Sequence, residues 1–367
     1  MNCYYCGKEL NKANKSDEHV IPNALGGKLK SDNLLCKDCN SILGSECDDL
    51  LTKQFAFFSQ FLLIKRQRGK NPGVCLKNNN GTEYILDGAN PPRLKHPVVS
   101  EETNGIIKTV RIECNPNETD GIIKTYKRKK NAVLVQRGFN QDTQDLGCSI
   151  EIGGEALLAV LKIAINYYLH ENGDCSKIKR AIDNLRKKDY LNVKPIQLDR
   201  SLFEHDEDLV FHSIWLHSGS KMLYAVVTLF SFFHFLVALT DEYTGNEISS
   251  LYVLDAINGI EFEKVKNTFT PEYSVLDRCE FGNDSFFDYI QKITKKLLSM
   301  GISIRDNRLI QEEKETISKT IAASWQSTVD QLISDGGKIT QESINLFFQE
   351  LGRRLMEEYR NKVSGGK

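Results

Sequence analysis

The chain has 367 residues, of which 40% are hydrophobic and 26% are charged, and its formal net charge at pH 7 is −1. This composition is typical of a folded soluble protein and argues against a disordered chain. A net charge near zero also excludes an overall positive field that would attract nucleic acid, so any surface of that kind must be local. The length predicts about two or three domains.

The N-terminus lacks the charged and apolar segments of a secretory signal peptide, so we expect a cytoplasmic protein. Its ten cysteines are then reduced, and paired cysteines indicate metal or redox chemistry rather than disulfides.

Two Cys-x-x-Cys pairs lie near the start of the chain, Cys3 with Cys6 and Cys36 with Cys39. Four thiolates at this spacing are typical of tetrahedral structural zinc. A unit of about fifty residues buries little apolar surface, so its folded state is only marginally stable from packing alone, and a bound metal would stabilise it. A redox motif needs only one such pair and a βαβ pattern around it, which is missing here. We therefore predict one structural zinc ion bound by the four cysteines.

Several short motifs lie between the two pairs and directly after them: Glu18-His19-Val20-Ile21-Pro22, Leu25-Gly26-Gly27, Asn33-Leu34 and Asn40. Together with the cysteines, this ordered set resembles the HNH endonucleases of the ββα-metal class, over residues 3 to 52 only. The resemblance implies a two-stranded hairpin that carries Glu18 and His19, followed by a helix that carries Asn40. Asn40 replaces the usual final histidine, which gives an H-N-N variant also found in active members such as the phage junction resolvases.

The resemblance implies a role for each of these polar residues. His19 is the general base that takes a proton from the attacking water, and Asn33 orients its ring. Glu18 and the amide of Asn40 bind a catalytic Mg²⁺ or Mn²⁺, since hard oxygen ligands suit these ions better than zinc. Phosphodiester hydrolysis needs such a base and such a cation. Neighbours on a regular strand point to opposite faces, so Glu18 and His19 share one site only if the strand ends or twists there.

A helix is expected from Asn40 to about residue 50. Gly44 lies one turn beyond Asn40 on the same face. It either admits the phosphate backbone of a substrate or packs closely against the hairpin. Asp48 is two turns from Asn40, and we interpret it first as a surface residue and second as an outer ligand of the metal.

Two basic clusters are candidate contacts to the DNA backbone. The first follows the head directly and consists of Lys65, Arg66, Arg68 and Lys70. The second consists of Lys124, Lys127, Arg128, Lys129 and Lys130. Such clusters give salt-sensitive, non-specific affinity for DNA, but charged runs are as often solvated faces.

The predicted fold class is α+β, with a small zinc-stabilised ββα-metal head and a larger mixed α/β body that ends in helices. The predicted regions are the head at 1–52, a helical, basic connector at 53–73, the body at 74–282 and a C-terminal helical region at 283–367. Within the body we expect short strands from 74 to 135 and a buried helix that ends at Asn172-Gly173. A surface helix over 175–189 and β structure from 208 to 263 follow.

Residues 222–239 are apolar and nearly long enough to cross a bilayer. Their β-branched and aromatic side chains favour two buried strands instead, 223–230 and 233–239, so no membrane partner is expected. The histidines in this part of the chain fit strand surfaces better than a metal site: His205, His212, His217 and His234.

Three C-terminal helical stretches are predicted, over 284–300, 311–335 and 340–362. The last carries an apolar stripe at helical spacing: Ile344, Phe347, Phe348, Leu351 and Leu355. Such a stripe either joins copies of the chain into a homo-oligomer or packs on the sheet of the body.

The first functional hypothesis is a metal-dependent HNH endonuclease that hydrolyses DNA. We find no second catalytic motif in the sequence, so the body is a sensor, a DNA-specificity module or an oligomerisation scaffold. Nuclease heads on large bodies resemble bacterial phage-defence effectors, in which the body restrains the nuclease. The alternatives are a zinc head that only binds nucleic acid or protein, and a nuclease subunit that is active only in an assembly.

Overall fold

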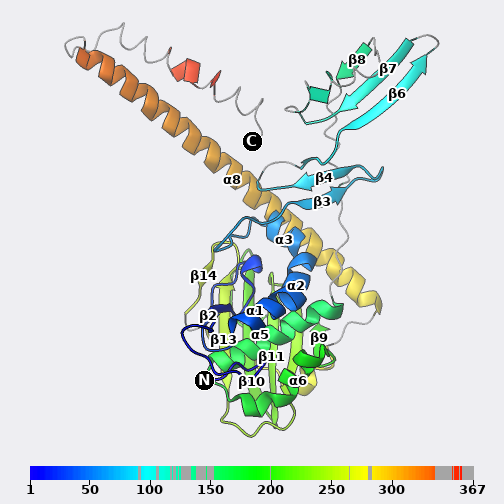
Figure 1. Cartoon of the computed structure of the whole chain (residues 1–367), viewed down its shortest axis with the longest axis vertical. Coiled ribbons are helices and arrows are strands. Elements are labelled where there is room, and N and C mark those ends of the chain that lie inside the picture. The colour runs from blue at the N-terminus through cyan, green and yellow to red at the C-terminus, as the bar shows by residue number, and fades with distance from the viewer. Residues whose placement is uncertain are drawn as a thin grey trace. The chain divides into compact units, whose positions relative to one another are not determined.

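A computed structural model describes residues 1–89, 92–104, 107–115, 118, 121–122, 124, 134–137, 146, 153–198, 200–263, 265–279, 283–334, 349, 351–354 and 356–357. The chain divides into two compact units (Figure 1). Unit 1 contains Met1–Val74 and Ser149–Ser303, and unit 2 contains Cys75–Cys148 and Ile304–Lys367. The α+β class is confirmed, because helices and antiparallel sheets both contribute to these units. Unit 1 joins the head to a large part of the body.

The head has the expected hairpin followed by a helix. Strands β1 (Glu18–His19) and β2 (Lys30–Ser31) pair antiparallel, with Glu18 opposite Ser31. A continuous helical path follows: α1 (Lys37–Leu43), a π-helical segment (Gly44–Asp48), α2 (Asp49–Gln54) and α3 (Ala56–Phe61). The helix therefore starts three residues before Asn40 and runs beyond the predicted end near residue 50.

Six antiparallel strands form the main sheet of unit 1, in the order β14-β13-β10-β11-β12-β9. Their bounds are β9 Val193–Ile196, β10 Phe211–Gly219, β11 Met222–Leu229, β12 Phe233–Thr240, β13 Ser249–Asp255 and β14 Ile260–Glu261. The two strands predicted within 222–239 are confirmed as β11 and β12. In the described part of the chain no helix is long and apolar enough to cross a membrane.

Helix α5 (Leu157–His170) lies between the head and this sheet (Figure 1). It is buried without interruption from Leu157 to Tyr168. Its neighbours are strands β10, β11 and β12 of the sheet, and the π-helical segment and α2 of the head. The helix ends at His170, and Asn172 follows with a left-handed φ of 63°, as expected for the end of this helix. The amphipathic helix α6 (Lys179–Lys187) follows.

Aromatic side chains hold the head on the sheet. Phe55 and Phe58, in the connector directly after the head, pack against Phe230 and Phe233 at the turn between β11 and β12, with ring centroids 4.9–5.9 Å apart. Such pairs add about 0.5–1.5 kcal/mol each beyond the burial of their area. The head is thus part of the core of unit 1.

The opposite face of the sheet carries a second apolar core that includes Trp215, Tyr224 and Leu276. Leu276 belongs to the short helix α7 (Tyr273–Leu276), and the long helix α8 (Asn283–Ser334) begins nearby in the chain. Two separate helices were expected within the span of α8, but the helix is continuous. Gly301 does not interrupt it; a Cβ there would lie 2.2 Å from the Phe61 ring, so this glycine allows α8 to approach α3.

Unit 2 contains two three-stranded sheets, which agree with the short strands predicted from residue 74 onward. The first is β3 (Val74–Lys77), β4 (Glu83–Leu86) and β5 (Arg93–Leu94), and the second is β6 (Val98–Asn104), β7 (Ile107–Glu113) and β8 (Leu134–Arg137). Of the second basic cluster only Lys124 lies within the described residues, and of the C-terminal apolar stripe only Leu351 does.

Candidate active site

The four cysteines predicted to bind zinc come together. Their Sγ atoms all lie within 4.8 Å of one another, and those of Cys6 and Cys36 are 3.8 Å apart. Tetrahedral zinc with Zn–S bonds of about 2.3 Å places its sulfurs about 3.8 Å apart. Cys3, Cys36 and Cys39 are buried, and Cys6 is exposed. The donor set and its spacing therefore fit a structural zinc ion.

Local backbone geometry builds each cysteine pair. Gly7 has a left-handed φ of +80°, and its N–H donates to the carbonyl of Cys3, which closes the first loop. The second pair begins helix α1, where the N–H of Asn40 donates to the carbonyl of Cys36. A zinc ion bound by Cys36 and Cys39 would therefore also hold the helix that carries Asn40.

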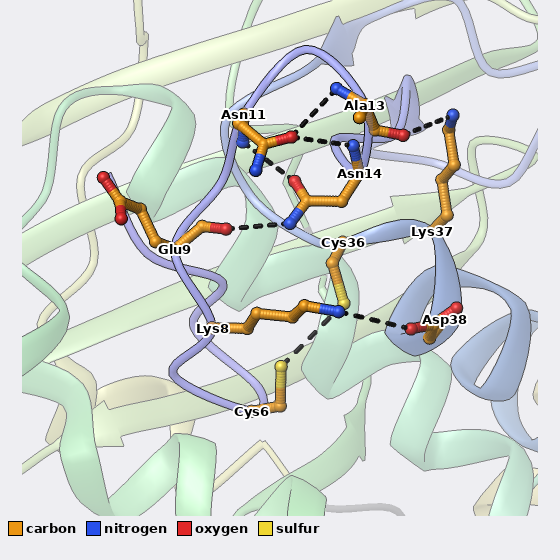
Figure 2. Close-up of polar contacts among 9 residues, drawn as sticks. All are labelled: Cys6, Lys8, Glu9, Asn11, Ala13, Asn14, Cys36, Lys37 and Asp38. Carbon is orange, nitrogen blue, oxygen red and sulfur yellow. Dashed lines mark hydrogen bonds and ion pairs between the residues drawn. The ribbon is translucent and has the colours of Figure 1, made fainter.

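Side-chain hydrogen bonds shape the loop between the first cysteine pair and the hairpin (Figure 2). Asn11 Oδ1 accepts from the backbone N–H groups of Ala13 and Asn14, and Asn14 Oδ1 accepts from the N–H of Asn11. Asn14 Nδ2 donates to the carbonyl of Glu9, and Lys37 Nζ donates to the carbonyl of Ala13. The loop is thus attached to α1 and leads the chain into β1 at a defined position.

A cleft of about 370 Å³ lies beside the hairpin. Its walls come from hairpin residues 17–19 and 22–24 and from helical residues 40, 44–45, 48–49 and 52. Three of the four residues predicted to be catalytic line it: Glu18, His19 and Asn40. Successive side chains of a regular strand point to opposite faces. Strand β1 is only two residues long, so this alternation is not maintained and Glu18 and His19 can both reach the cleft.

His19 is half-buried and held by a residue of the basic connector. Its Nε2 lies 3.2 Å from Gln67 Oε1, and donation to this oxygen leaves Nδ1 as the proton acceptor. The N–H of Gln67 donates to Asn23 Oδ1 at 2.8 Å, which fixes the connector to the cleft wall. Burial lowers the pKa of His19, and the charges of Lys30 and Arg68 act in the same direction. The ring is therefore neutral near pH 7 and can accept a proton.

Asn33 lies apart from this arrangement. It is exposed, does not line the cleft, and has no side-chain hydrogen bond to His19 among the described residues. The side chain of Gln67 contacts the His19 ring. No sequence motif identified Gln67 as a site residue. Its position between Arg66 and Arg68 of the first basic cluster is the one signal that could have identified it. The orienting role of Asn33 remains a prediction from the resemblance.

Asp48 lines the cleft beside Asn40 and Glu18. The sequence suggested a surface residue two α-helical turns from Asn40. The helix is π-helical from Gly44 to Asp48, and a π turn contains more residues than an α turn, which changes the residues that share a face. The side chain of Asp48 is 20% exposed, and its Oδ1 atom is buried with no hydrogen-bond partner in the described part of the chain.

Lys162 of helix α5 lies between the two acidic side chains. Its Nζ is 2.5 Å from Glu18 Oε1 and 2.6 Å from Asp48 Oδ2, and its side chain is 2% exposed. Burial raises the pKa of Glu18 and of Asp48, and the charge of Lys162 opposes both shifts. No sequence motif singled out Lys162, although a single charge within an apolar helix is unusual and is a signal that could have identified it.

The cleft has the ligand types that Mg²⁺ or Mn²⁺ prefers. Asn40, Glu18 and Asp48 supply amide and carboxylate oxygens, and Asp48 Oδ1 is a buried acceptor without a partner. These residues fit a hard divalent cation better than zinc.

Gly44 lines the cleft, with helical φ and ψ of −58° and −47°. A Cβ on Gly44 would meet no atom within 4 Å. Close packing against the hairpin is therefore not the reason for glycine at this position, and the access of a phosphate backbone remains the open prediction.

The first basic cluster is attached to the cleft through Gln67. Its exposed members are Lys65, Arg68 and Lys70, whereas Arg66 is half-buried and donates to the carbonyl of Lys70 at 3.4 Å. The charge of Arg68 acts on the pKa of His19, which indicates that the cluster and the cleft are close together. Its contact with DNA remains a prediction.

The histidines of the body do not form a metal site. His212 and His217 lie on β10 and His234 on β12, and the only metal-binding group among the described residues is the four cysteines. His212 is fully buried rather than at a strand edge. Its Nε2–H donates to the carbonyl of Leu25 at 2.8 Å, and its Nδ1 accepts from the N–H of Phe230.

Residues 3–56 match the model of the HNH endonuclease family. No curated protein and no solved structure matches the chain. The N-terminal head, which holds the four-cysteine group and the cleft with Glu18, His19 and Asn40, is therefore an HNH endonuclease domain.

Proposed function

We propose that this protein is a metal-dependent endonuclease that hydrolyses DNA phosphodiester bonds in the cleft of its head. The observation that supports this most is the convergence of Glu18, His19 and Asn40 on one cleft, with the carboxylate of Asp48 beside them. A zinc head that served only as a docking module would not need a half-buried neutral histidine beside hard oxygen ligands.

Each residue has a role in the proposed reaction. Glu18, Asp48 and Asn40 would hold a Mg²⁺ or Mn²⁺ ion, which would supply stabilisation of the negative charge that develops in phosphodiester hydrolysis. His19 accepts a proton from the attacking water through Nδ1, and Gln67 keeps its ring in position. The exposed basic residues of the connector contact the DNA backbone, which gives salt-dependent affinity.

Nicking of supercoiled plasmid by the purified protein with Mg²⁺ or Mn²⁺ tests this function. We expect His19→Ala to abolish cleavage while zinc content and DNA affinity stay near those of the wild type, because the change removes the base and leaves the scaffold. A well-folded His19→Ala protein that still nicks DNA would show that the assignment is wrong. DNA binding without cleavage by the wild type would favour the docking module.

We also propose that the body restrains the nuclease and that the protein is an antiviral effector that works as a homo-oligomer or with a partner protein. The burial of α5 against the head supports a regulatory body. Light scattering after size-exclusion chromatography measures the oligomeric state, and plaque counts on cells with wild-type or His19→Ala protein measure defence. A monomer that cuts freely without any added factor would contradict both ideas.

A further inference from the structure

The nuclease cleft and the body share a buried polar network through helix α5. Lys162 and Asn166 are one helical turn apart and point to the same side of α5. Asn166 is fully buried, and its Nδ2 donates to Glu18 Oε1 at 3.1 Å. The same oxygen contacts Lys162 Nζ. The body therefore contributes both polar contacts made by the Glu18 side chain within the described residues.

This network continues to the zinc site. The hydroxyl of Tyr4 donates to Asn166 Oδ1 at 2.8 Å, and Tyr4 lies between the ligands Cys3 and Cys6. The amide of Asn166 is thereby oriented with its nitrogen toward Glu18. The cysteine loop, helix α5 and β1 thus hold one another in a fixed arrangement.

In each of the two carboxylates, Glu18 and Asp48, the two oxygens differ in their contacts. Lys162 binds Oε1 of Glu18 and Oδ2 of Asp48. Among the described residues, no hydrogen bond reaches Glu18 Oε2, and Asp48 Oδ1 is buried without a partner. One oxygen of each carboxylate is therefore anchored, and the other is left available. This is the arrangement by which outer contacts orient the ligands of a metal ion.

We propose that Lys162 is a positioning residue of the nuclease centre, supplied by the body, which orients Glu18 and Asp48 for the catalytic cation. The inference rests on the proposed function. Lys162 separates two buried carboxylates that would otherwise repel each other, and it directs one oxygen of each away from the cation site. The HNH domain is therefore completed by a residue more than one hundred positions away, which makes helix α5 part of the nuclease.

Full-length Lys162→Met and Lys162→Arg proteins test the proposal, with Lys188→Met as the matched control. Lys188 also joins body to head, through an ion pair with Glu46 at 3.2 Å, but these side chains are 54% and 40% exposed and lie outside the cleft. Mn²⁺ binding is measured by electron paramagnetic resonance without DNA, and kcat and KM are measured by plasmid nicking.

For Lys162→Met we expect Mn²⁺ affinity and kcat to fall by about 10- to 100-fold, as is typical when a contact to a metal ligand is lost. The KM for DNA stays within about twofold of the wild type, because the basic connector is intact. Lys162→Arg restores part of the loss, and Lys188→Met behaves as the wild type. Unchanged or tighter Mn²⁺ binding by a folded Lys162→Met protein would overturn the proposal, since Lys162 would then be a passive neutraliser or a competitor of the cation.

A second variant covers the case in which Lys162→Met does not fold. Asn166→Leu removes the other contact to Glu18 without leaving an unpaired charge, and we expect a weaker but measurable loss of Mn²⁺ affinity. Wild-type Mn²⁺ affinity in folded Asn166→Leu would count against positioning by α5. If the wild-type protein binds Mn²⁺ but cuts no DNA, the proposed function fails, and the Mn²⁺ measurements still decide the role of Lys162.

Discussion

The two glycines Gly27 and Gly44 lie in the same small head, and replacement of each by alanine should have opposite effects on stability. Gly27 follows the short 3-10 turn Asn23–Leu25. A Cβ on Gly27 would lie 1.9 Å from the carbonyl oxygen of Ile21 and 2.7 Å from its carbonyl carbon. Gly44 is helical, and a Cβ there meets nothing within 4 Å.

The structure sets the size of each effect. Ordinary contacts of a Cβ begin near 3.4 Å, so Gly27→Ala must move the backbone of Ile21, a residue that is 1% exposed. Overpacking of this kind costs about 1–3 kcal/mol, and we expect at least the upper value because backbone atoms on both sides must shift. Gly44→Ala should stabilise the helix by about 0.5–1 kcal/mol, since alanine loses less backbone entropy than glycine.

Thermal unfolding of the two variants, with zinc content measured in parallel, checks this prediction. A change of 1 kcal/mol shifts Tm by about 2–4 °C in a unit of this size. Gly27→Ala should therefore melt well below the wild type and lose zinc more readily, and Gly44→Ala should melt at or slightly above it. Equal melting temperatures for all three proteins would refute the assignment of Gly27 to a close backbone approach.

Two further predictions concern the metal and pH. The purified protein should hold one tightly bound zinc ion per chain, and Cys36→Ser should unfold the head; elemental analysis that finds no zinc in folded protein would contradict the site. Burial lowers the pKa of His212 to about 4, below its unfolded value, so its contribution to stability is complete above about pH 6.5 and declines as pH falls toward 4. The decline amounts to at most about 3 kcal/mol, measured as the difference between wild type and His212→Gln in denaturant titrations across this range. An identical pH dependence in the two proteins would show that His212 is not buried as a neutral ring.

Short-range spacing in the sequence was sufficient to predict the four-cysteine group, and the resemblance predicted the hairpin-helix order of the head. Two residues between the cysteines of a pair allow one turn to supply two sulfurs. This local geometry does not depend on how the head packs against the rest of the chain. The same applies to strands β11 and β12, whose β-branched and aromatic residues indicated buried strands rather than a membrane helix. The sequence also placed Glu18, His19 and Asn40 in one site through the resemblance.

Tertiary structure alone decided which groups surround these residues. Lys162 reaches Glu18 only because α5 packs between the head and the sheet, and no local pattern connects positions so far apart in the chain. Gln67 reaches His19 because the connector folds back along the cleft. A π turn, which depends on small differences in hydrogen bonding, places Asp48 in the cleft. Covalent spacing determines which residues are neighbours within a turn, whereas the charge and contacts of a buried site depend on how distant segments pack.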